Sequence, residues 1–245
     1  MNNSKKVALV TGSSRGIGKA IAIGLATSGH KVILHALHES EALKGVEHEL
    51  KTLGAWASTT IFDVSDKKGV ESACALVLEN VGMVDILVNN AGVANDKPFI
   101  KMTDQEFDAV IKTNLYGPFY VTHQFLPKMQ ENNFGRIINM SSIAVRGAFG
   151  KTNYAAAKAG VIGMTKSLAL EVGKYNITVN AVCPGYIDTE LSAAIPKEYR
   201  SQFLKQIALG RIGSPEEVAN VVTFLASEQA SYISGAVIDV NGGWL

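Results

Sequence analysis

Short runs of apolar, often β-branched residues alternate along the chain with longer segments in which apolar residues recur at helical spacing. The runs are nearly continuous in apolar character, which is typical of strands covered by helices on both faces. The predicted strands are Val7–Val10, Lys31–His35, Trp56–Ile61, Asp85–Asn89, Arg136–Met140, Ile177–Val182 and Ala236–Val240. The predicted helices are Gly16–Ser28, Ser40–Thr52, Asp66–Asn80, Thr103–Gln130, Tyr154–Lys174 and Pro215–Ala226. This alternation predicts an α/β fold with one doubly wound parallel sheet.

Two of the predicted helices begin with capping signals. Thr103 is followed three residues later by Glu106, the capping-box arrangement, and Ser214 precedes Pro215 and Glu216 in a first helical turn. Both helices are therefore expected to start where the apolar spacing places them.

The chain shows no internal repeat and no linker rich in Pro, Gly or Ser, so we expect one domain over residues 1–245. The segment Tyr186–Gly210 interrupts the alternation with polar, weakly helical sequence. An insertion just past the carboxyl end of a strand is where this architecture places a substrate lid, and the alternative is an ordinary surface loop.

Composition and charge narrow the classes of protein. The 245 residues are 47% hydrophobic, and a net charge of +1 gives no field that would concentrate a nucleic acid or an anionic membrane. No apolar run approaches the ~20 residues of a membrane helix, and the first apolar run is too short for a signal peptide. Cys74 and Cys183 lie far apart without metal-ligand spacing, so we expect reduced, buried thiols, no bound metal and a cytoplasmic protein.

A glycine-rich turn follows the first predicted strand and opens the first helix. Its sequence is Thr11-Gly12-Ser13-Ser14-Arg15-Gly16-Ile17-Gly18. Glycines here allow a tight turn and let backbone N–H groups at a helix N-terminus approach a pyrophosphate. The spacing Gly-x-x-x-Gly-x-Gly differs from the commoner Gly-x-Gly-x-x-Gly, but the strand–turn–helix context favours a dinucleotide site over a simple tight connection.

The residues around this turn favour NADPH over NADH. NAD sites usually place an acidic residue near the end of the second strand, where it binds the ribose 2′-hydroxyl. Here that strand ends His35-Ala36-Leu37-His38, and the next acidic residue is Glu39. Arg15 stands in the turn where a cation would meet a 2′-phosphate, and His38 is placed to assist. The alternative for Arg15 is a solvated surface side chain.

Two polar motifs follow later strands. Asp63-Val64 comes after the third predicted strand, and Asn89-Asn90-Ala91-Gly92 ends the fourth. Sheets of this kind hold their ligand at the carboxyl ends of the strands, so both motifs are expected to form a wall of the cofactor site. Asp63 alone would equally suit a cap, and its pairing with the second motif favours the cofactor role.

An acid–base pair is predicted at the start of the helix Tyr154–Lys174. Tyr154 and Lys158 stand four residues apart and share one helix face. A phenol with its usual pKa near 10 is a poor acid–base group at pH 7, and a nearby ammonium together with an oxidised nicotinamide would lower that pKa. The spacing alone is common, so the assignment depends on what else converges there.

Two further polar groups are expected near this pair. Asn139-Met140-Ser141-Ser142 closes the fifth predicted strand and places a serine hydroxyl where it would donate to a carbonyl oxygen; the alternative is a capping serine. Asn114 lies inside the helix Thr103–Gln130 shortly before a Gly-Pro pair, which indicates a kink or bulge. Water in such a bulge would carry a proton toward Lys158.

Together these residues resemble the motifs of the short-chain dehydrogenase/reductase family over essentially the whole chain. The matching motifs are the glycine turn, Asp63-Val64, Asn89–Gly92, Asn114, the serine after the fifth strand, Tyr154-x-x-x-Lys158 and Pro184-Gly185-Tyr186-Ile187-Asp188-Thr189. Within the family the chain is most similar to the β-ketoacyl carrier-protein reductases and the acetoacetyl-CoA reductases, on the stretches Asn153–Gly160 and Ile177–Asn180.

The resemblance implies a seven-stranded parallel sheet in the order 3-2-1-4-5-6-7, and a homotetramer that associates through the fourth and fifth helices and the last strand. It implies NADPH-dependent reduction of a 3-oxoacyl thioester, as in fatty acid biosynthesis. The catalytic residues would be Tyr154 as acid, Lys158 at the ribose, Ser142 at the carbonyl and Asn114 at a relay water. The residues expected to bind the cofactor are Gly12, Ser14, Arg15, Gly16, Ile17, Gly18, His38, Asp63, Val64, Asn90, Ala91, Gly92, Tyr154, Lys158, Pro184, Gly185, Ile187 and Thr189.

Two departures from the family pattern leave questions open. The family's serine usually lies 13 residues before the tyrosine, which would select Ser141, whereas counting from the end of the strand favours Ser142 with one residue missing from the next loop. Relatives that act on acyl carrier protein carry a basic cluster before the fifth strand. Here the residues 130–133 are not basic, although Lys128, Arg136 and Lys174 flank them, so the carrier stays open between acyl carrier protein and coenzyme A.

Two other functions compete with this one. A dehydrogenase of another small secondary alcohol, such as a sugar or a steroid, would use the same chemistry, because substrate choice resides in Tyr186–Gly210 and the loop Ile143–Thr152. A non-catalytic regulator that senses NADPH would need the dinucleotide site alone, and the intact set of serine, tyrosine, lysine and asparagine argues against it.

Overall fold

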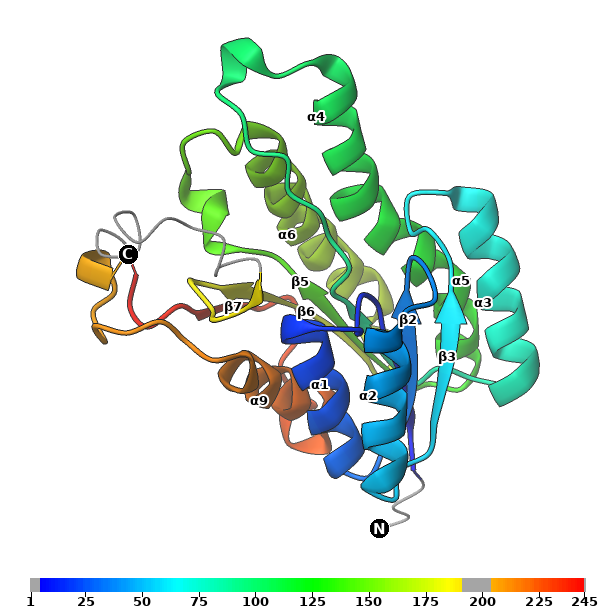
Figure 1. Cartoon of the computed structure of the whole chain (residues 1–245). Coiled ribbons are helices and arrows are strands. Elements are labelled where there is room, and N and C mark those ends of the chain that lie inside the picture. Colours follow the sequence, from blue (N-terminus) through cyan, green and yellow to red (C-terminus); the bar gives the residue numbers. More distant parts are fainter. Residues whose placement is uncertain (1–4, 191–203, 245) are drawn as a thin grey trace.

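The computed structural model of the chain describes residues 5–190 and 204–244. Seven parallel strands form one sheet in the order β3-β2-β1-β4-β5-β6-β7, so the predicted fold class and strand order are confirmed (Figure 1). Every predicted strand is present, with ends that shift by one or two residues. The strands are β1 (Val7–Val10), β2 (Lys31–Ala36), β3 (Ala57–Ile61), β4 (Ile86–Asn89), β5 (Gly135–Met140), β6 (Ile177–Pro184) and β7 (Val237–Val240).

The helices also lie where the apolar spacing predicts them. The predicted helix Thr103–Gln130 is divided by a π turn, η2 (Lys112–Tyr116), so the bulge expected around Asn114 is confirmed. The α-helices are α1 (Gly16–Thr27), α2 (Glu41–Thr52), α3 (Lys67–Val81), α4 (Asp104–Ile111), α5 (Gly117–Glu131), α6 (Thr152–Val172) and α9 (Pro215–Ala226). Short 3₁₀ turns are η1 (Phe99–Lys101), η3 (Ile143–Arg146), η4 (Gly173–Tyr175) and η5 (Glu228–Ala230).

The core lies in two layers, one on each face of the sheet. Successive side chains of a strand point to opposite faces, so Ala8 and Val10 of β1 join one buried cluster while Leu9 joins the other. The first cluster includes residues of α1, α2 and α9, and the second includes residues of α3, α5 and α6 (Figure 1). The near-continuous apolar runs in the sequence are explained by this double cover.

The capping signals behave as predicted. Thr103 and Ser214 each form a complete capping box, with Glu106 and Glu217 as the third residues of their helices. Cys74 and Cys183 are buried and form no disulfide. In the described part of the chain no helix is long and apolar enough to cross a membrane, and no cluster of His, Cys, Asp and Glu residues is suited to a metal ion.

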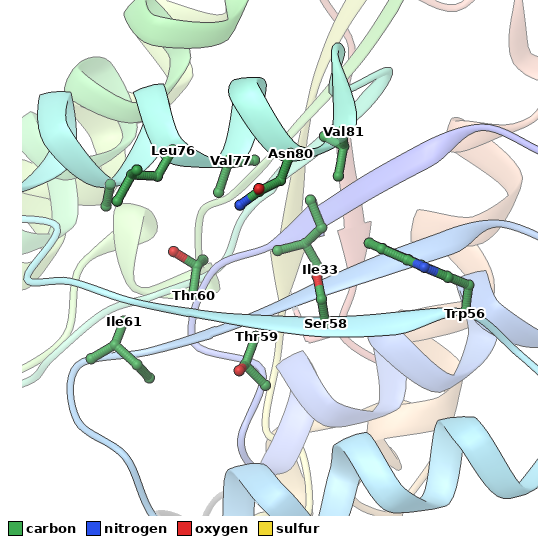
Figure 2. A pocket seen from close by; sticks show the side chains of 11 residues that line it. Ile33, Trp56, Ser58, Thr59, Thr60, Ile61, Leu76, Val77, Asn80 and Val81 are labelled. Carbon is green, nitrogen blue, oxygen red and sulfur yellow. The ribbon is translucent and has the colours of Figure 1, made fainter.

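A cavity of about 430 Å³ opens at the outer edge of the sheet, between the edge strand β3 and α3. Figure 2 shows side chains of α3, among them Val77 and Asn80, directed toward Ser58 and Thr60 of β3. None of the residues that line it belongs to the predicted cofactor or catalytic set. This cavity is therefore separate from the site described next.

Candidate active site

The glycine turn joins the end of β1 to α1 and needs glycine at two positions in particular. Gly12 has a φ of 65°, which L side chains rarely adopt, and an added Cβ there would lie 2.9 Å from Ala91 Cα. A Cβ on Gly18 would lie 2.2 Å from the carbonyl oxygen of Gly12. These glycines let the N-terminus of α1 pack directly on the turn, which leaves its backbone N–H groups available to an anion.

The end of β4 is tied to this turn by four hydrogen bonds. Thr11 Oγ1 accepts from the backbone N–H groups of Asn90 and Ala91, each at 2.9 Å. Asn90 Nδ2 donates to the carbonyl oxygens of Thr11 at 2.9 Å and Gly12 at 3.0 Å. The structure therefore brings the predicted cofactor residues Asn90–Gly92 against the glycine turn.

The residues predicted to recognise the 2′-phosphate lie on the surface. The Arg15 guanidinium is exposed and lies 3.3 Å from the carboxylate of Glu190, and a cavity of about 390 Å³ lined partly by Ser14, Arg15 and Gly16 lies beside it. Leu37 and His38 follow β2 directly, and both are exposed. No acidic side chain occupies these two positions after β2.

Asp63 and Val64 follow β3 and have different environments. The Asp63 carboxylate is exposed, and its Oδ1 accepts from the backbone N–H of Ser65 at 2.8 Å and from the Ser65 hydroxyl at 2.7 Å. Val64 is buried against Gly117, where an added Cβ would lie 2.9 Å from Val64 Cγ2. Asp63 thus caps its own turn with one oxygen, and the other stays available to a ligand.

Tyr154 and Lys158 lie one turn apart on α6, as predicted. Lys158 is 3% exposed, its Nζ lies 5.6 Å from the centre of the Tyr154 ring, and it donates to the carbonyl oxygen of Met140 at 2.7 Å. Burial lowers the pKa of Lys158 to about 8, so the ammonium form predominates at pH 7. An ammonium has three donors, and within the described residues one is used, which leaves two for a ligand.

The Tyr154 phenol lies close to the hydroxyl of Ser142. Burial raises the pKa of Tyr154, the Ser142 hydroxyl opposes that shift, and the charge of Asp96 adds to it. The pKa of Tyr154 is therefore raised, whereas a lowered pKa is expected when the Lys158 ammonium and an oxidised nicotinamide both lie beside the phenol. In the chain alone, the loss of hydration outweighs the opposing effect of the Ser142 hydroxyl.

The two serines at the end of β5 face different partners. Ser141 is 4% exposed, and its hydroxyl donates to the carbonyl oxygen of Lys158 at 2.9 Å. Ser142 is partly exposed, and its Oγ accepts from the backbone N–H of Ala144 at 3.1 Å, on the same side as Tyr154. The structure therefore groups Ser142, and not Ser141, with the phenol.

Asn114 is fully buried in the π turn η2, close to Lys158. Its Oδ1 accepts from the backbone N–H of Val93 at 3.2 Å, and its Nδ2 donates to the carbonyl oxygens of Val93 at 2.8 Å and Val110 at 2.9 Å. A Cβ on Gly92 would lie 2.5 Å from Asn114 Oδ1 and 3.7 Å from Lys158 Nζ. The side chain therefore keeps one acceptor lone pair for a water, next to the ammonium.

The segment after β6 crosses toward the glycine turn. Pro184 ends β6, and Gly185 packs so closely on Asn241 that a Cβ would lie 2.7 Å from its Cα. Ile187 is buried and pairs with Gly213 in an isolated bridge. A Cβ on Gly16 would lie 3.5 Å from Thr189 Cγ2, so Thr189 faces the turn. Residues 191–203 of the predicted lid lie outside the described residues.

Two positions, Arg136 and His35, are buried and bonded to backbone. Arg136, expected to flank a docking surface, is fully buried, with its guanidinium bonded to the carbonyl oxygens of Gly135 at 2.9 Å and Asn176 at 3.1 Å. It is therefore not available to an acidic partner. His35, on β2, is 2% exposed and bonded to the glycine turn. Its signal in the sequence is a polar residue inside an otherwise apolar strand.

Comparison with known proteins agrees with this geometry. Residues 12–245 match the family described as enoyl-(acyl carrier protein) reductase. The 3-oxoacyl-[acyl-carrier-protein] reductase FabG of Aquifex aeolicus is 46% identical over 239 residues, which is 97% of this chain and 96% of that protein. The acetoacetyl-CoA reductase of Rhizobium meliloti is 46% identical (97% and 98% covered), and the FabG of Escherichia coli is 44% identical (99% and 98% covered). The chain belongs to the short-chain dehydrogenase/reductase family.

Proposed function

We propose that the protein is an oxidoreductase that reduces the ketone of a 3-oxoacyl thioester to the 3-hydroxyacyl thioester with NADPH. The observation that carries this function is the grouping of Ser142, Tyr154 and Lys158 beside the glycine turn. The names of relatives that match nearly the whole chain, 3-oxoacyl-[acyl-carrier-protein] reductase and acetoacetyl-CoA reductase, support the substrate class.

The proposed dinucleotide would lie along the carboxyl edge of the sheet. The glycine turn and the N-terminus of α1 would hold the pyrophosphate, with Ser14, Ile17 and Asn90–Gly92 along the wall. The two unused donors of Lys158 would hold the nicotinamide ribose, and Pro184–Thr189 would lie against the nicotinamide. NADPH supplies the hydride that reduces the ketone carbon.

Preference for NADPH over NADH is proposed to come from Arg15, assisted by His38. Both side chains of the Arg15–Glu190 pair are exposed, and an exposed ion pair contributes little to the free energy of unfolding. A 2′-phosphate carries more charge and accepts two parallel bonds from a guanidinium, so it would displace Glu190.

The proton chemistry follows from the positions of the side chains. As the carbonyl is reduced, negative charge grows on its oxygen, and the Ser142 hydroxyl donates a hydrogen bond to it. Tyr154 then gives its proton to that oxygen, and its raised pKa keeps the phenol protonated at neutral pH until that step. Lys158 stabilises the resulting phenolate, and a water held near Asn114 would return the proton.

The loop that contains Lys97 and the loop that contains Gly150 favour an apolar substrate over a sugar. The two loops are joined by a hydrogen bond from the Lys97 backbone N–H to the Gly150 carbonyl oxygen at 2.8 Å. Phe99, Ile100 and Phe149 lie on them and are 74%, 92% and 92% exposed. An acyl chain would cover such side chains, which carry no group that selects a polyol.

Acyl carrier protein is a weaker candidate partner than coenzyme A on the described surface. Besides the buried Arg136, Lys128 is already paired with Glu131 at 2.6 Å. Lys174 alone of the three flanking cations is exposed without an ion pair among the described residues. Coenzyme A thioesters therefore need fewer rearrangements of this surface.

The assembly and location are also proposals. We expect one catalytic domain with 186–210 as a substrate lid, in a cytoplasmic homotetramer. Apolar side chains stand exposed on the elements expected to associate, including Tyr116 and Phe119 at 45% and 50%, Leu170 at 88% and Tyr232 at 102%. Light scattering after size-exclusion chromatography tests the tetramer directly.

The reaction is tested by following NADPH oxidation at pH 7 with acetoacetyl-CoA and with an acetoacetyl carrier protein. Crotonyl-CoA tests reduction of a carbon–carbon double bond instead, and NADH replaces NADPH in parallel. We expect ketone reduction with NADPH, and a loss of about 10²-fold or more in kcat for Tyr154→Phe with NADPH binding retained.

Other outcomes separate the alternatives. NADPH binding without turnover of either thioester would overturn the proposal and direct the search to small secondary alcohols. Full function of Tyr154→Phe in cells would indicate a regulator rather than an enzyme.

A further inference from the structure

We infer that His35 is a positioning residue of the dinucleotide site, whose neutral imidazole joins the glycine turn to the segment that follows β3. This inference rests on the proposed cofactor. His35 lies near the end of β2 and is 2% exposed. Its Nδ1 lies 3.0 Å from the backbone nitrogen of Gly12, and its Nε2 lies 2.9 Å from the carbonyl oxygen of Phe62.

The partners of the two ring nitrogens determine the tautomer. The Gly12 N–H can only donate, so Nδ1 accepts and carries no proton. The Phe62 carbonyl oxygen can only accept, so Nε2 carries the proton. The imidazole is therefore neutral and protonated on Nε2, and a second proton would place two donors face to face at Gly12.

The two partners belong to two different segments of the proposed site. Gly12 is the first glycine of the turn, and its carbonyl oxygen is bonded to Asn90. Phe62 immediately precedes Asp63 and Val64, which are proposed to line the cofactor. One side chain thus fixes these two segments relative to each other.

Additional contacts fix both the backbone and the ring of His35, so the imidazole cannot shift freely to another position. The Ser13 hydroxyl accepts from the His35 backbone N–H at 2.9 Å, and the Ser13 N–H donates to the His35 carbonyl oxygen at 3.0 Å. The ring packs on Phe62 with centroids 4.1 Å apart. Loss of the Nδ1 acceptor would leave the partly buried Gly12 N–H without its protein partner, and the turn would have to move to recover one.

The charged group that acts on His35 is Asp63. Its carboxylate favours the protonated ring, as does the Phe62 carbonyl oxygen, but burial outweighs both and lowers the pKa of His35 to about 4. The neutral form that the geometry requires is therefore maintained across the physiological range.

The test compares His35→Phe, which keeps the ring shape without nitrogens, with His35→Asn, whose Oδ1 retains an acceptor near Nδ1. The NADPH dissociation constant is measured by fluorescence, and KM and kcat with acetoacetyl-CoA. We expect the dissociation constant and KM for NADPH to rise about tenfold in His35→Phe, with kcat at saturation changed less than threefold. His35→Asn should return both to within about threefold of wild type. His48→Phe, at an exposed histidine of α2, is the matched control.

Two further readouts keep the outcomes distinct. The ¹⁵N shifts of the ring in the cofactor-free protein should show an unprotonated Nδ1 and a protonated Nε2. If His35→Phe does not fold, His35→Asn should bind NADPH more tightly than His35→Gln, which retains a donor toward Phe62 only. Equal affinities, an unchanged affinity of folded His35→Phe, or an Nδ1-protonated ring would overturn the role of His35. A wild-type protein that binds no NADPH would instead overturn the proposed cofactor, and this role with it.

Discussion

At the scale of single residues, chemistry in this site depends on which way adjacent side chains face. Ser141 and Ser142 follow β5 directly, and consecutive residues of an extended backbone point to opposite sides. Ser141 faces the backbone of α6, whereas Ser142 faces the Tyr154 phenol. A difference of one position thus separates a structural hydroxyl from one placed to donate to substrate.

Replacement of these serines should separate the two roles. Ser142→Ala should lower kcat/KM for acetoacetyl-CoA by about 10²-fold, because a donor to the developing oxyanion is lost. The pKa of Tyr154 should rise further, because the Ser142 hydroxyl now lowers it. Ser141→Ala should lower the free energy of unfolding by about 1 kcal/mol and kcat/KM by less than fivefold. A larger kinetic loss in Ser141→Ala would contradict this assignment.

Leu37 is the second position where one side chain decides a property. It follows β2 and is 50% exposed, so a charge there disturbs no core. Leu37→Asp should lower the ratio of kcat/KM for NADPH over NADH at least about tenfold, because its carboxylate would repel a 2′-phosphate. Leu37→Asn has the same shape without the charge and should leave most of the ratio intact. An unchanged ratio in Leu37→Asp would show that the 2′-phosphate binds elsewhere.

The residues that the sequence revealed are those whose partners lie close in the chain or at the same sheet edge. Tyr154 and Lys158 share a helix face by spacing alone, so their proximity was predictable. His35 acts across three segments, and nothing in its neighbourhood of the sequence indicates Gly12 or Phe62 as partners. The burial of Arg136 was missed for a similar reason, because one of its two acceptors, the Asn176 carbonyl oxygen, comes from distant backbone.

At the scale of elements, short runs rich in apolar or β-branched residues were sufficient to locate all seven strands, and capping residues located helix starts. The division of one long helix into α4, η2 and α5 was only partly predictable. Asn114 and the following Gly-Pro pair indicated a bulge, but its π geometry depends on the bonds between Asn114 and Val93. Those bonds join segments about 20 residues apart, which periodicity does not report.

The packing of α1 on the glycine turn gives a prediction about a whole element. Gly18→Ala would place a methyl group 2.2 Å from the Gly12 carbonyl oxygen, so α1 must move away from the turn. We expect a loss of about 1–3 kcal/mol in the free energy of unfolding, and NADPH binding weakened more than tenfold. Gly45→Ala in α2 meets nothing within 4 Å and should stabilise by up to about 1 kcal/mol. Urea unfolding measures both, and equal effects would refute the close-packing argument.

At the scale of the whole molecule, the site forms because parallel strands place their carboxyl ends at one edge. From that rule, the turn after β1 and the motifs after β3, β4, β5 and β6 were predicted to lie close together. The strand order itself came from the family resemblance, since apolar runs carry no information on which strands are neighbours. The exposure of apolar side chains such as Tyr232 is not visible in the apolar pattern, so the pattern does not predict an assembly.

The pH dependence of stability is a property of the whole fold to which His35 contributes. A free histidine has a pKa near 6.5, whereas burial lowers the pKa of His35 to about 4. Between these values the unfolded chain binds a proton that the folded chain does not. The contribution is therefore fully present above pH 6.5, is lost as the pH falls, and is absent below pH 4.

This contribution should be measurable as a difference between wild type and His35→Asn. From pH 7 to pH 5 the wild type should lose about 2 kcal/mol more of its free energy of unfolding than the variant, because the variant has no group that titrates at this position. His30, whose pKa burial also lowers, is common to both proteins and cancels. Urea unfolding at pH 7, 6 and 5 gives the two slopes, and His48→Asn should follow the wild type. Parallel slopes for wild type and His35→Asn would mean that His35 is protonated equally in the folded and unfolded chains.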